Sequence, residues 1–306
     1  MSDFITVIIP TFNPNRERLR LTIEGLKNQT LATHFWELII VDNNSSNRFE
    51  QNTDLSWHPA ASILKENRQG LTFARLKGFV EAKGNYIVMI DDDNVIEEKY
   101  LEQALHILKN NPEIGCAGGI SEPIFASQPP QWLSHFYENL ALRNYGSEVI
   151  IEKWSGKYPQ VAPIGAGMVV RKEALANYIG KILNSAHIIA DRKGNSLSSG
   201  GDNDIVLEII RAGWAVGYFP QLCLKHIIPH GRMQVDYMAR LVYDSNISWV
   251  RILENHGINP WKKIYSSTLL PRYIKAWFKN SAWRGGKNYI MWKSDCGLYK
   301  GLAEID

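Results

Sequence analysis

Asp91, Asp92 and Asp93 form a run of three consecutive carboxylates directly after the apolar stretch 86–90. Adjacent negative charges repel one another, so such a run is costly to hold without a counter-charge. A divalent cation supplies that charge, and carboxylate oxygens suit Mg²⁺ or Mn²⁺. The run therefore predicts metal or phosphate chemistry. The alternative is a solvated acidic turn in which Asn94 caps the next helix.

Asn13 and Asp42 also follow short apolar stretches, residues 4–9 and 36–41, which read as buried strands. Stretches with apolar residues on one helical face lie between the strands, at 19–26, 71–82 and 101–108. Strands that alternate with such helices indicate βαβ units and a parallel sheet, where ligands bind at the carboxyl ends of the strands. We therefore expect Asn13, Asp42 and the three aspartates on one rim of the sheet.

The pattern becomes looser beyond Pro112. Further strands are expected at residues 62–65, 114–120, 164–170, 214–219 and 222–227, and a helix at 205–212. From Gly231 onward the chain looks helical and basic, with no internal repeat and no low-complexity linker. One α/β body with a C-terminal helical extension is the most economical arrangement.

Composition limits the class of protein. The 306 residues are 45% hydrophobic and 21% charged, which excludes a disordered or fibrous chain, and a net charge of +3 does not indicate nucleic-acid binding. Cys116, Cys223 and Cys296 are too far apart for a disulfide framework or a zinc ligand set, which favours a cytoplasmic location. We expect no signal peptide, and no apolar run approaches the roughly 18 residues of a membrane span.

Several short motifs occur in a specific order. They are Ile-Ile-Pro-Thr-Phe-Asn at 8–13, Val-Asp-Asn-Asn-Ser-Ser at 41–46, Asn67-x-x-Gly70 with Ala74-Arg75, the aspartates at 91–93, Gly-Ala-Gly-Met at 165–168, Gly-Gly-Asp-Asn-Asp at 200–204 and Arg-Ala-Gly-Trp at 211–214. As a set they resemble the family 2 glycosyltransferases, over about residues 4–230. The resemblance implies a GT-A fold, a Rossmann-like, mostly parallel sheet flanked by helices. It also implies a GT-A domain at 1–230, with a nucleotide-sugar half (1–110) and an acceptor half (111–230), followed by a helical extension at 231–306.

The resemblance implies contacts to a nucleotide-sugar donor. Asp42 matches an aspartate that accepts a hydrogen bond from the base ring, which suits the imide N–H of uracil or thymine, while Arg75 matches a position beside the diphosphate. The alternatives are a turn-forming role for Asp42 and a surface salt bridge for Arg75. The donor-side candidates are Pro10, Thr11, Asn13, Asp42, Asn67, Gly70, Arg75, Asp91 and Asp92.

The resemblance also implies a metal site for Mn²⁺ or Mg²⁺. Asp93 matches the direct metal ligand, and Asp91 matches a ribose or water-mediated contact. His226 falls where many GT-A enzymes place a late metal ligand, with His230 as a weaker candidate. The alternative for His226 is a structural role on a strand.

Asp202 matches the catalytic base of the family. Gly201 stands where the family usually has Glu, so the neighbouring role is either lost or taken by Asp204. The alternative is that Asp202 or Asn203 caps the helix that follows. The acceptor-side candidates are Trp132, Gly165, Gly167 and Asp204.

The expected activity is inverting transfer of a sugar from a UDP- or dTDP-linked donor to a hydroxyl of a glycan or lipid-linked acceptor. A nucleotidyltransferase acting on sugar phosphates is one alternative, although its Gly-rich phosphate loop is missing after the first strand. A phosphatase of the haloacid dehalogenase type is another, since Asp91-x-Asp93 resembles its nucleophile motif. A non-catalytic sugar-binding protein is a third.

Residues 251–306 differ from the rest of the chain in charge. They carry ten Lys and Arg against four Asp and Glu, a balance of +6, whereas residues 1–250 carry −3. Four Trp lie among these basic residues. This composition predicts peripheral contact with the inner face of the cell membrane, and the alternative is a solvated helical lid. A long basic run is missing, so no nucleic-acid partner is expected.

Overall fold

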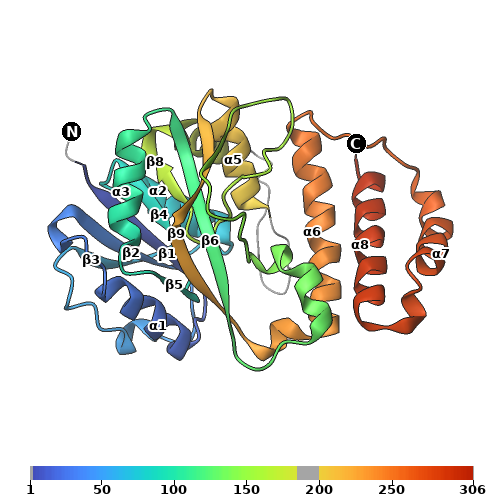
Figure 1. The fold of residues 1–306 in the computed structure, drawn as a ribbon, viewed down its shortest axis with the longest axis horizontal. Coiled ribbons are helices and arrows are strands. Elements are labelled where there is room, and N and C mark those ends of the chain that lie inside the picture. The colour runs from blue at the N-terminus through green and yellow to red at the C-terminus, as the bar shows by residue number, and fades with distance from the viewer. Residues whose placement is uncertain (1–2, 185–199, 306) are drawn as a thin grey trace. The chain divides into compact units, whose positions relative to one another are not determined.

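The computed structural model describes residues 3–184 and 200–305, which divide into two compact units (Figure 1). Of the described residues, 3–124, 141–184 and 201–227 form the first unit, and 125–140, 200 and 228–305 form the second. The second unit takes in the chain from Ile228 onward, whereas the helical extension was expected from residue 231. It also contains residues 125–140, which the sequence placed in the acceptor half.

The first unit is built on one mixed sheet. Its strands are β1 (Ile5–Thr11), β2 (Trp36–Asp42), β3 (Ala61–Lys65), β4 (Tyr86–Met89), β5 (Asn94–Ile96), β6 (Ile114–Phe125), β7 (Ile150–Glu152), β8 (Val169–Arg171) and β9 (Ala215–Ile228), in the order β3-β2-β1-β4-β8-β6-β9-β5 with β7 beside β9. The pairs β2–β3, β1–β2 and β1–β4 are parallel. Beyond β4, β8 pairs antiparallel with β4 and β6, and β9 with β5 and β7. The parallel part thus contains the strands on which the sequence prediction rested.

Helices cover both faces of this sheet. They are α1 (Arg16–Lys27), α2 (Leu71–Glu81), α3 (Tyr100–Asn110), α4 (Ala176–Asn184) and α5 (Gly201–Arg211). Successive residues of a strand point to opposite faces. Ile5, Val7 and Ile9 accordingly join the core under α1 and α3, while Ile8 joins the core under α2, α4 and α5. The expected helices at 19–26, 71–82 and 101–108 are confirmed as α1, α2 and α3.

Several elements differ from the sequence expectation, and three of them carry or adjoin candidate site residues. The strand expected at 164–170 is shortened to β8, because residues 165–168 form a turn with Gly167 at a φ of 76°. The strands expected at 214–219 and 222–227 are one strand, β9, whose successive stretches pair with different neighbours. Helix α5 begins at Gly201, four residues earlier than expected, and its first turn holds two aspartates that favour a helix N-terminus.

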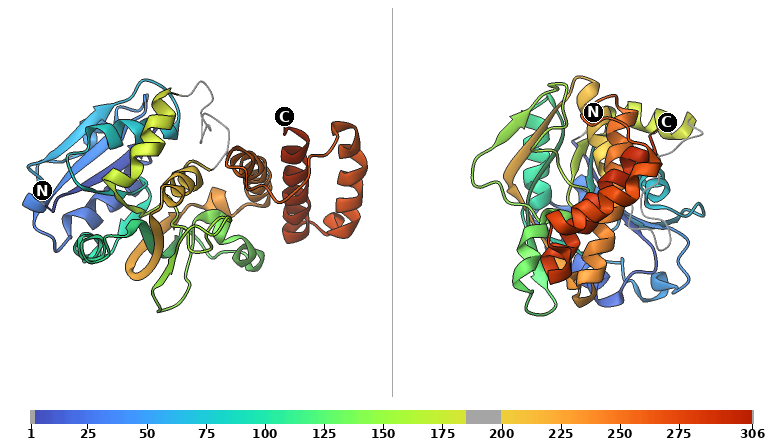
Figure 2. Two further views of the ribbon diagram at one scale, coloured as in Figure 1. Left: turned by 90° about the horizontal axis from the view of Figure 1, so that it is seen from above. Right: turned by 90° about the vertical axis from the view of Figure 1, so that its right-hand side faces the viewer.

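The second unit is mainly helical, with α6 (Val235–Asn255), α7 (Leu269–Lys279) and α8 (Gly286–Ala303). Helix α8 packs against both α6 and α7, and Figure 2 shows these three helices. Contact between α6 and α8 is close at Gly297, where a Cβ atom would lie 2.3 Å from the backbone oxygen of Tyr243. In the part of the chain that the structure describes, no helix has the length and apolar character needed to cross a membrane.

Candidate active site

The loops that follow β1, β2 and β3 are tied together by side chains, and we call residues 12–15, 43–48 and 66–70 the strand-end loops. Asn13 has a left-handed backbone (φ 47°), which Asn tolerates, and its Oδ1 accepts hydrogen bonds from the backbone N–H groups of Ser46 (2.8 Å) and Asn47 (3.2 Å). Oδ1 of Asp42 accepts from the backbone N–H of Ser45 at 2.8 Å. Asn13 therefore has a structural function, whether or not it also contacts a nucleotide.

Asn43 connects the second and third of these loops. Its side chain is buried; Nδ2 donates to the carbonyls of Glu66 (3.1 Å) and Arg68 (2.8 Å), and Oδ1 accepts from the N–H of Gly70 (2.7 Å). The sequence reasoning missed this residue. An Asn after Asp42 indicates a turn, but not the loop to which its amide binds.

Gly70 and Arg75 lie at the start of α2. Gly70 precedes the helix with a φ of 136°, and Arg75 is buried one turn later. The guanidinium lies against Gly165, where a Cβ atom would come within 2.5 Å of its Nη2. Because Arg75 is buried, it does not form a salt bridge on the surface, which was the alternative role. Asn67 is exposed in the loop before Gly70.

The three aspartates follow β4 at the rim where β1 and β2 end. Pro10 pairs with Val41 inside the sheet, and the hydroxyl of Thr11 donates to Asp92. Burial and the neighbouring charge of Asp93 raise the pKa of Asp92 to about 6. Asn94 begins β5, and its Oδ1 accepts from the N–H of Asp91 at 3.0 Å. The alternative of an Asn94 helix cap does not hold, because α3 begins at Tyr100.

Asp93 is buried beside two basic side chains. Its Oδ1 lies 3.3 Å from Nε2 of His226, and its Oδ2 lies 3.6 Å from Nη1 of Arg18. The antiparallel pairing of β5 with β9 sets Asn94 opposite His226. It thereby places Asp93, the residue before Asn94, beside His226. One carboxylate and one imidazole, from Asp93 and His226, are ligand types that suit a divalent cation such as Mn²⁺. Arg18, which adds a positive charge on α1, was not a candidate in the sequence analysis, because no local motif marks it.

His230 belongs to the second unit. There its Nδ1 lies 3.1 Å from Oγ of Ser127, and its Nε2 lies 3.0 Å from Nε2 of Gln234. His230 therefore has side-chain partners within its own unit.

Asp202 lies in the first turn of α5 and is partly exposed. Its Oδ2 accepts from the N–H of Gly165 at 2.9 Å, and its Oδ1 accepts from the N–H of Asn203 at 3.0 Å. Oδ1 of Asn203 in turn accepts from the hydroxyl of Tyr158 at 2.6 Å. Burial, helped by the negative charge of Asp202, raises the pKa of Tyr158 well above its usual value, so this hydroxyl stays protonated. Tyr158 was not a sequence candidate.

The turn at 165–168 connects Asp202 to the acidic end of β4. At one end, Gly165 binds Asp202 and contacts Arg75. At the other, the N–H of Gly167 donates to the carbonyl of Met89 at 2.9 Å, two residues before Asp91. The structure thus groups Arg75, Gly165, Gly167 and Asp202 around the strand that carries the three aspartates.

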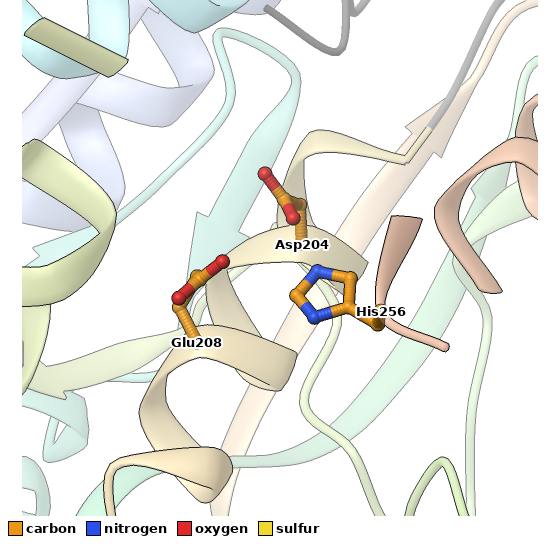
Figure 3. Close-up of side chains that lie close together, drawn as sticks. All are labelled: Asp204, Glu208 and His256. Carbon is orange, nitrogen blue, oxygen red and sulfur yellow. The ribbon is translucent and has the colours of Figure 1, made fainter. Parts of the chain in front are cut away.

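Asp204 has a different environment from Asp202. Figure 3 shows Asp204 and Glu208 one turn apart on α5. Nζ of Lys181, on α4, lies 2.6 Å from Asp204 and 2.8 Å from Glu208. Burial lowers the pKa of Lys181, but the two carboxylates outweigh this effect and raise it above its usual value. Asp204 therefore forms a buried ion pair, whereas Asp202 is bound by backbone N–H groups.

Trp132 lies in the second unit, in the 3₁₀ helix Gln131–Phe136. Its ring packs edge-on against Phe136 at 6.2 Å, and its Cδ1 lies 4.0 Å from the position that a Cβ at Gly286 would take.

His256, the third side chain drawn in Figure 3, follows the last residue of α6 in the second unit. Its backbone N–H donates to the carbonyl of Ile252.

Relatives of this chain are sugar transferases by name. It is 32% identical over 110 residues to the poly(ribitol-phosphate) beta-N-acetylglucosaminyltransferase TarP of Staphylococcus aureus, which is 35% of this chain and 33% of the relative. It is 22% identical over 240 residues to the glucosyl-dolichyl phosphate glucuronosyltransferase of Haloferax volcanii, 77% of this chain and 72% of the relative. The match thus spans only about a third of the staphylococcal protein.

A crystal structure of S. aureus TarS, residues 1–349, in complex with UDP has a similar fold. The TM-score is 0.55 at 12% identity, with 98% of this chain and 90% of that chain covered. This likeness supports the expected fold class. The model of the family "Glycosyl transferase family 2" matches residues 6–178, more than half of the sequence. The chain therefore belongs to glycosyl transferase family 2.

Proposed function

We propose that this protein is an inverting glycosyltransferase that moves a sugar from a UDP- or dTDP-linked donor to a hydroxyl of a glycan or lipid-linked acceptor. The observation that carries the proposal is the pairing of Asp93 with His226 at the end of β4, beside the turn that binds Asp202. Membership of family 2 favours sugar transfer over the nucleotidyltransferase and phosphatase alternatives.

The strand-end rim would bind the nucleotide. Asp42 would accept a hydrogen bond from the base imide, an acceptor-only role that suits a carboxylate. Asp91 would contact the ribose, and Arg75, buried beside Gly165, would face the diphosphate. The UDP complex of the structurally similar TarS protein supports UDP as the first nucleotide to test.

Asp202 would act as the general base. The acceptor hydroxyl oxygen forms a bond to the anomeric carbon of the donor, and its proton passes to the Asp202 carboxylate. The bond from that carbon to the diphosphate oxygen breaks, and its electron pair leaves with the diphosphate. Displacement from the opposite side inverts the anomeric configuration. The N–H groups of Gly165 and Asn203 hold the carboxylate in place for this transfer.

Asp93 and His226 would hold a divalent ion, Mn²⁺ or Mg²⁺. When bound, this ion would neutralise the charge that develops on the leaving diphosphate. Arg18, 3.6 Å from Asp93, would add a second positive charge, which would also help to neutralise the leaving diphosphate.

The acceptor would contain a glycan or a lipid-linked phosphate, as the names of the two relatives suggest for those proteins. Trp132, Gly165 and Gly167 stay candidates for this side. Incubation of the purified protein with a panel of nucleotide sugars and Mn²⁺ tests the activity through release of the free nucleotide. Release that requires one nucleotide sugar and one acceptor is the expected result, and no release from any UDP or dTDP sugar would contradict the proposal.

The metal site has a test that does not need turnover. Calorimetric titration with UDP, with and without Mn²⁺, should show binding that is stronger with the ion, and His226→Gln should remove most of that difference. His106→Gln, an exposed histidine on α3, is the matched control and should behave as wild type. Equal Mn²⁺ dependence in both variants would exclude His226 from the ligand set.

A further inference from the structure

Helix α7 carries an exposed apolar face. Leu270, Ile274 and Phe278 follow one another at intervals of four residues, so they lie on one side of the helix. Their exposed fractions are 69%, 52% and 65%. Trp283 continues the face beyond the helix; it is 56% exposed, and its ring lies 5.9 Å from that of Phe278. We call these four residues the α7 face.

A different side of α7 attaches the helix to α8. Ala276 is buried, and the ring of Trp277 packs at right angles on Trp292 at 4.8 Å. Nε1 of Trp292 donates to the carbonyl of Tyr273 at 3.0 Å, and Nδ2 of Asn280 donates to Asp295 at 2.8 Å. These contacts between α7 and α8 are made by side chains other than those of the α7 face.

Positively charged residues lie on α7 and in the segments directly before and after it. The sequence of α7 contains no Asp or Glu, and it includes Arg272, Lys275 and Lys279. Lys262 and Lys263 precede the helix, and Arg284 follows Trp283. Lys262, Lys263 and Lys275 form no ion pair with any residue that the structure describes. Their charges are thus available to an external anion.

We propose that the α7 face binds the surface of an anionic lipid bilayer, with α7 lying in the headgroup region. An interfacial helix combines apolar and aromatic residues on one face with Lys and Arg beside them, which is the arrangement here. Trp at the headgroup level and Lys near anionic lipid both stabilise such binding. The broad prediction for residues 251–306 is thereby narrowed to four side chains and their neighbouring lysines.

A second copy of the chain fits this surface less well. Two α7 faces in contact would bring the lysines of both copies together, and like charges at close range repel. An anionic surface supplies the opposite charge to the same lysines. The proposal concerns binding alone, so it is independent of donor, acceptor and turnover.

Co-sedimentation of the full chain with vesicles tests the proposal. Wild type should bind vesicles of phosphatidylglycerol and phosphatidylcholine, and should bind phosphatidylcholine alone much more weakly. Binding should also weaken between 0.05 and 0.5 M NaCl, about the range over which the Debye length shortens from over 10 Å to under 5 Å. Ile274→Glu should lower the affinity by about tenfold or more, because it removes an inserted side chain and adds a negative charge.

Val80→Glu is the matched control. Val80 is also a β-branched residue that is 52% exposed on a helix, but it lies on α2 in the first unit. The variant should bind as wild type. A Lys262→Gln, Lys263→Gln double variant gives a second test on a solvent-exposed segment, with a loss of about fivefold per lysine.

Three results would overturn the proposal. They are failure of the wild type to bind anionic vesicles, equal binding by the Ile274→Glu and Val80→Glu variants, and self-association in solution that Ile274→Glu abolishes without any vesicle binding. Light scattering after gel filtration measures the last of these.

Discussion

The strand-end loops and the acidic end of β4 contain similar residues in similar places, but their side chains behave differently. At the ends of β1 and β2, Asn13, Asp42 and Asn43 form hydrogen bonds with backbone groups of the strand-end loops. After β4, the carboxylates of Asp92 and Asp93 are crowded, and the pKa of Asp92 is raised to about 6. The first region holds the rim in shape, whereas the second concentrates negative charge.

The difference shows what a polar residue after a strand does in each setting. Where unpaired backbone N–H and C=O groups lie nearby, a short polar side chain satisfies them and becomes structural. Where several carboxylates share few donors, the repulsion between them is relieved by an added cation. Substitutions in the first region should therefore change folding stability, and those in the second should change binding or turnover.

The largest effect should come from Asp202→Asn. Asparagine keeps an oxygen that can accept from the Gly165 N–H but cannot take a proton, so turnover should fall by about 10²–10⁴-fold with donor affinity and thermal stability near wild type. Steady-state kinetics measure the turnover, and UDP titration measures the donor affinity.

Asp204→Asn is the counterpart on the same helix turn. It breaks the buried ion pair with Lys181 and should lower the free energy of unfolding by about 1–3 kcal/mol. If Asp204→Asn instead removes turnover without lowering stability, Asp204 is the base.

Asn43→Ala should have a smaller effect, and on stability. It leaves two carbonyls and one N–H of the strand-end loops without their partner, at a cost of about 2–3 kcal/mol in the free energy of unfolding. Thermal or urea unfolding measures the change. Asn67→Ala, an exposed residue of the same loops, is the control and should leave stability unchanged. An equal loss in both variants would remove the special role of Asn43, and a fall in UDP affinity for Asn67→Ala would support its predicted contact with the nucleotide.

The smallest effect is expected at Arg18. Arg18→Met removes a positive charge 3.6 Å from Asp93, so Mn²⁺ should bind more tightly, by roughly fivefold for about 1 kcal/mol of relieved repulsion. Electron paramagnetic resonance of free Mn²⁺ during a titration measures the affinity. Arg16→Met removes an exposed charge from the same helix turn and should leave the affinity unchanged. Weaker Mn²⁺ binding by Arg18→Met would show that Arg18 supports the ion.

The sequence alone determined the alternation of strands and helices, the family, and which residue types lie at the strand ends. Local signals carry this information: the apolar period of α1–α3, the polar residues after β1, β2 and β4, and the order of the motifs. The sequence also placed Asp93 and His226 in one candidate set, although 132 residues lie between them. That choice came from the resemblance and not from any local pattern.

Tertiary structure alone decided the contacts between residues far apart in the chain. The register of β5 against β9 sets His226 beside Asp93, and periodicity carries no information about register. Asp202 and Asp204 lie two residues apart in the sequence, but the two sides of α5 give Asp202 the Gly165 N–H and Asp204 the ammonium group of Lys181. A helical, basic and Trp-containing segment after Gly231 is visible in the sequence, but only packing on α8 determines which apolar residues of α7 are covered, because burial depends on the partner element and not on the helix itself.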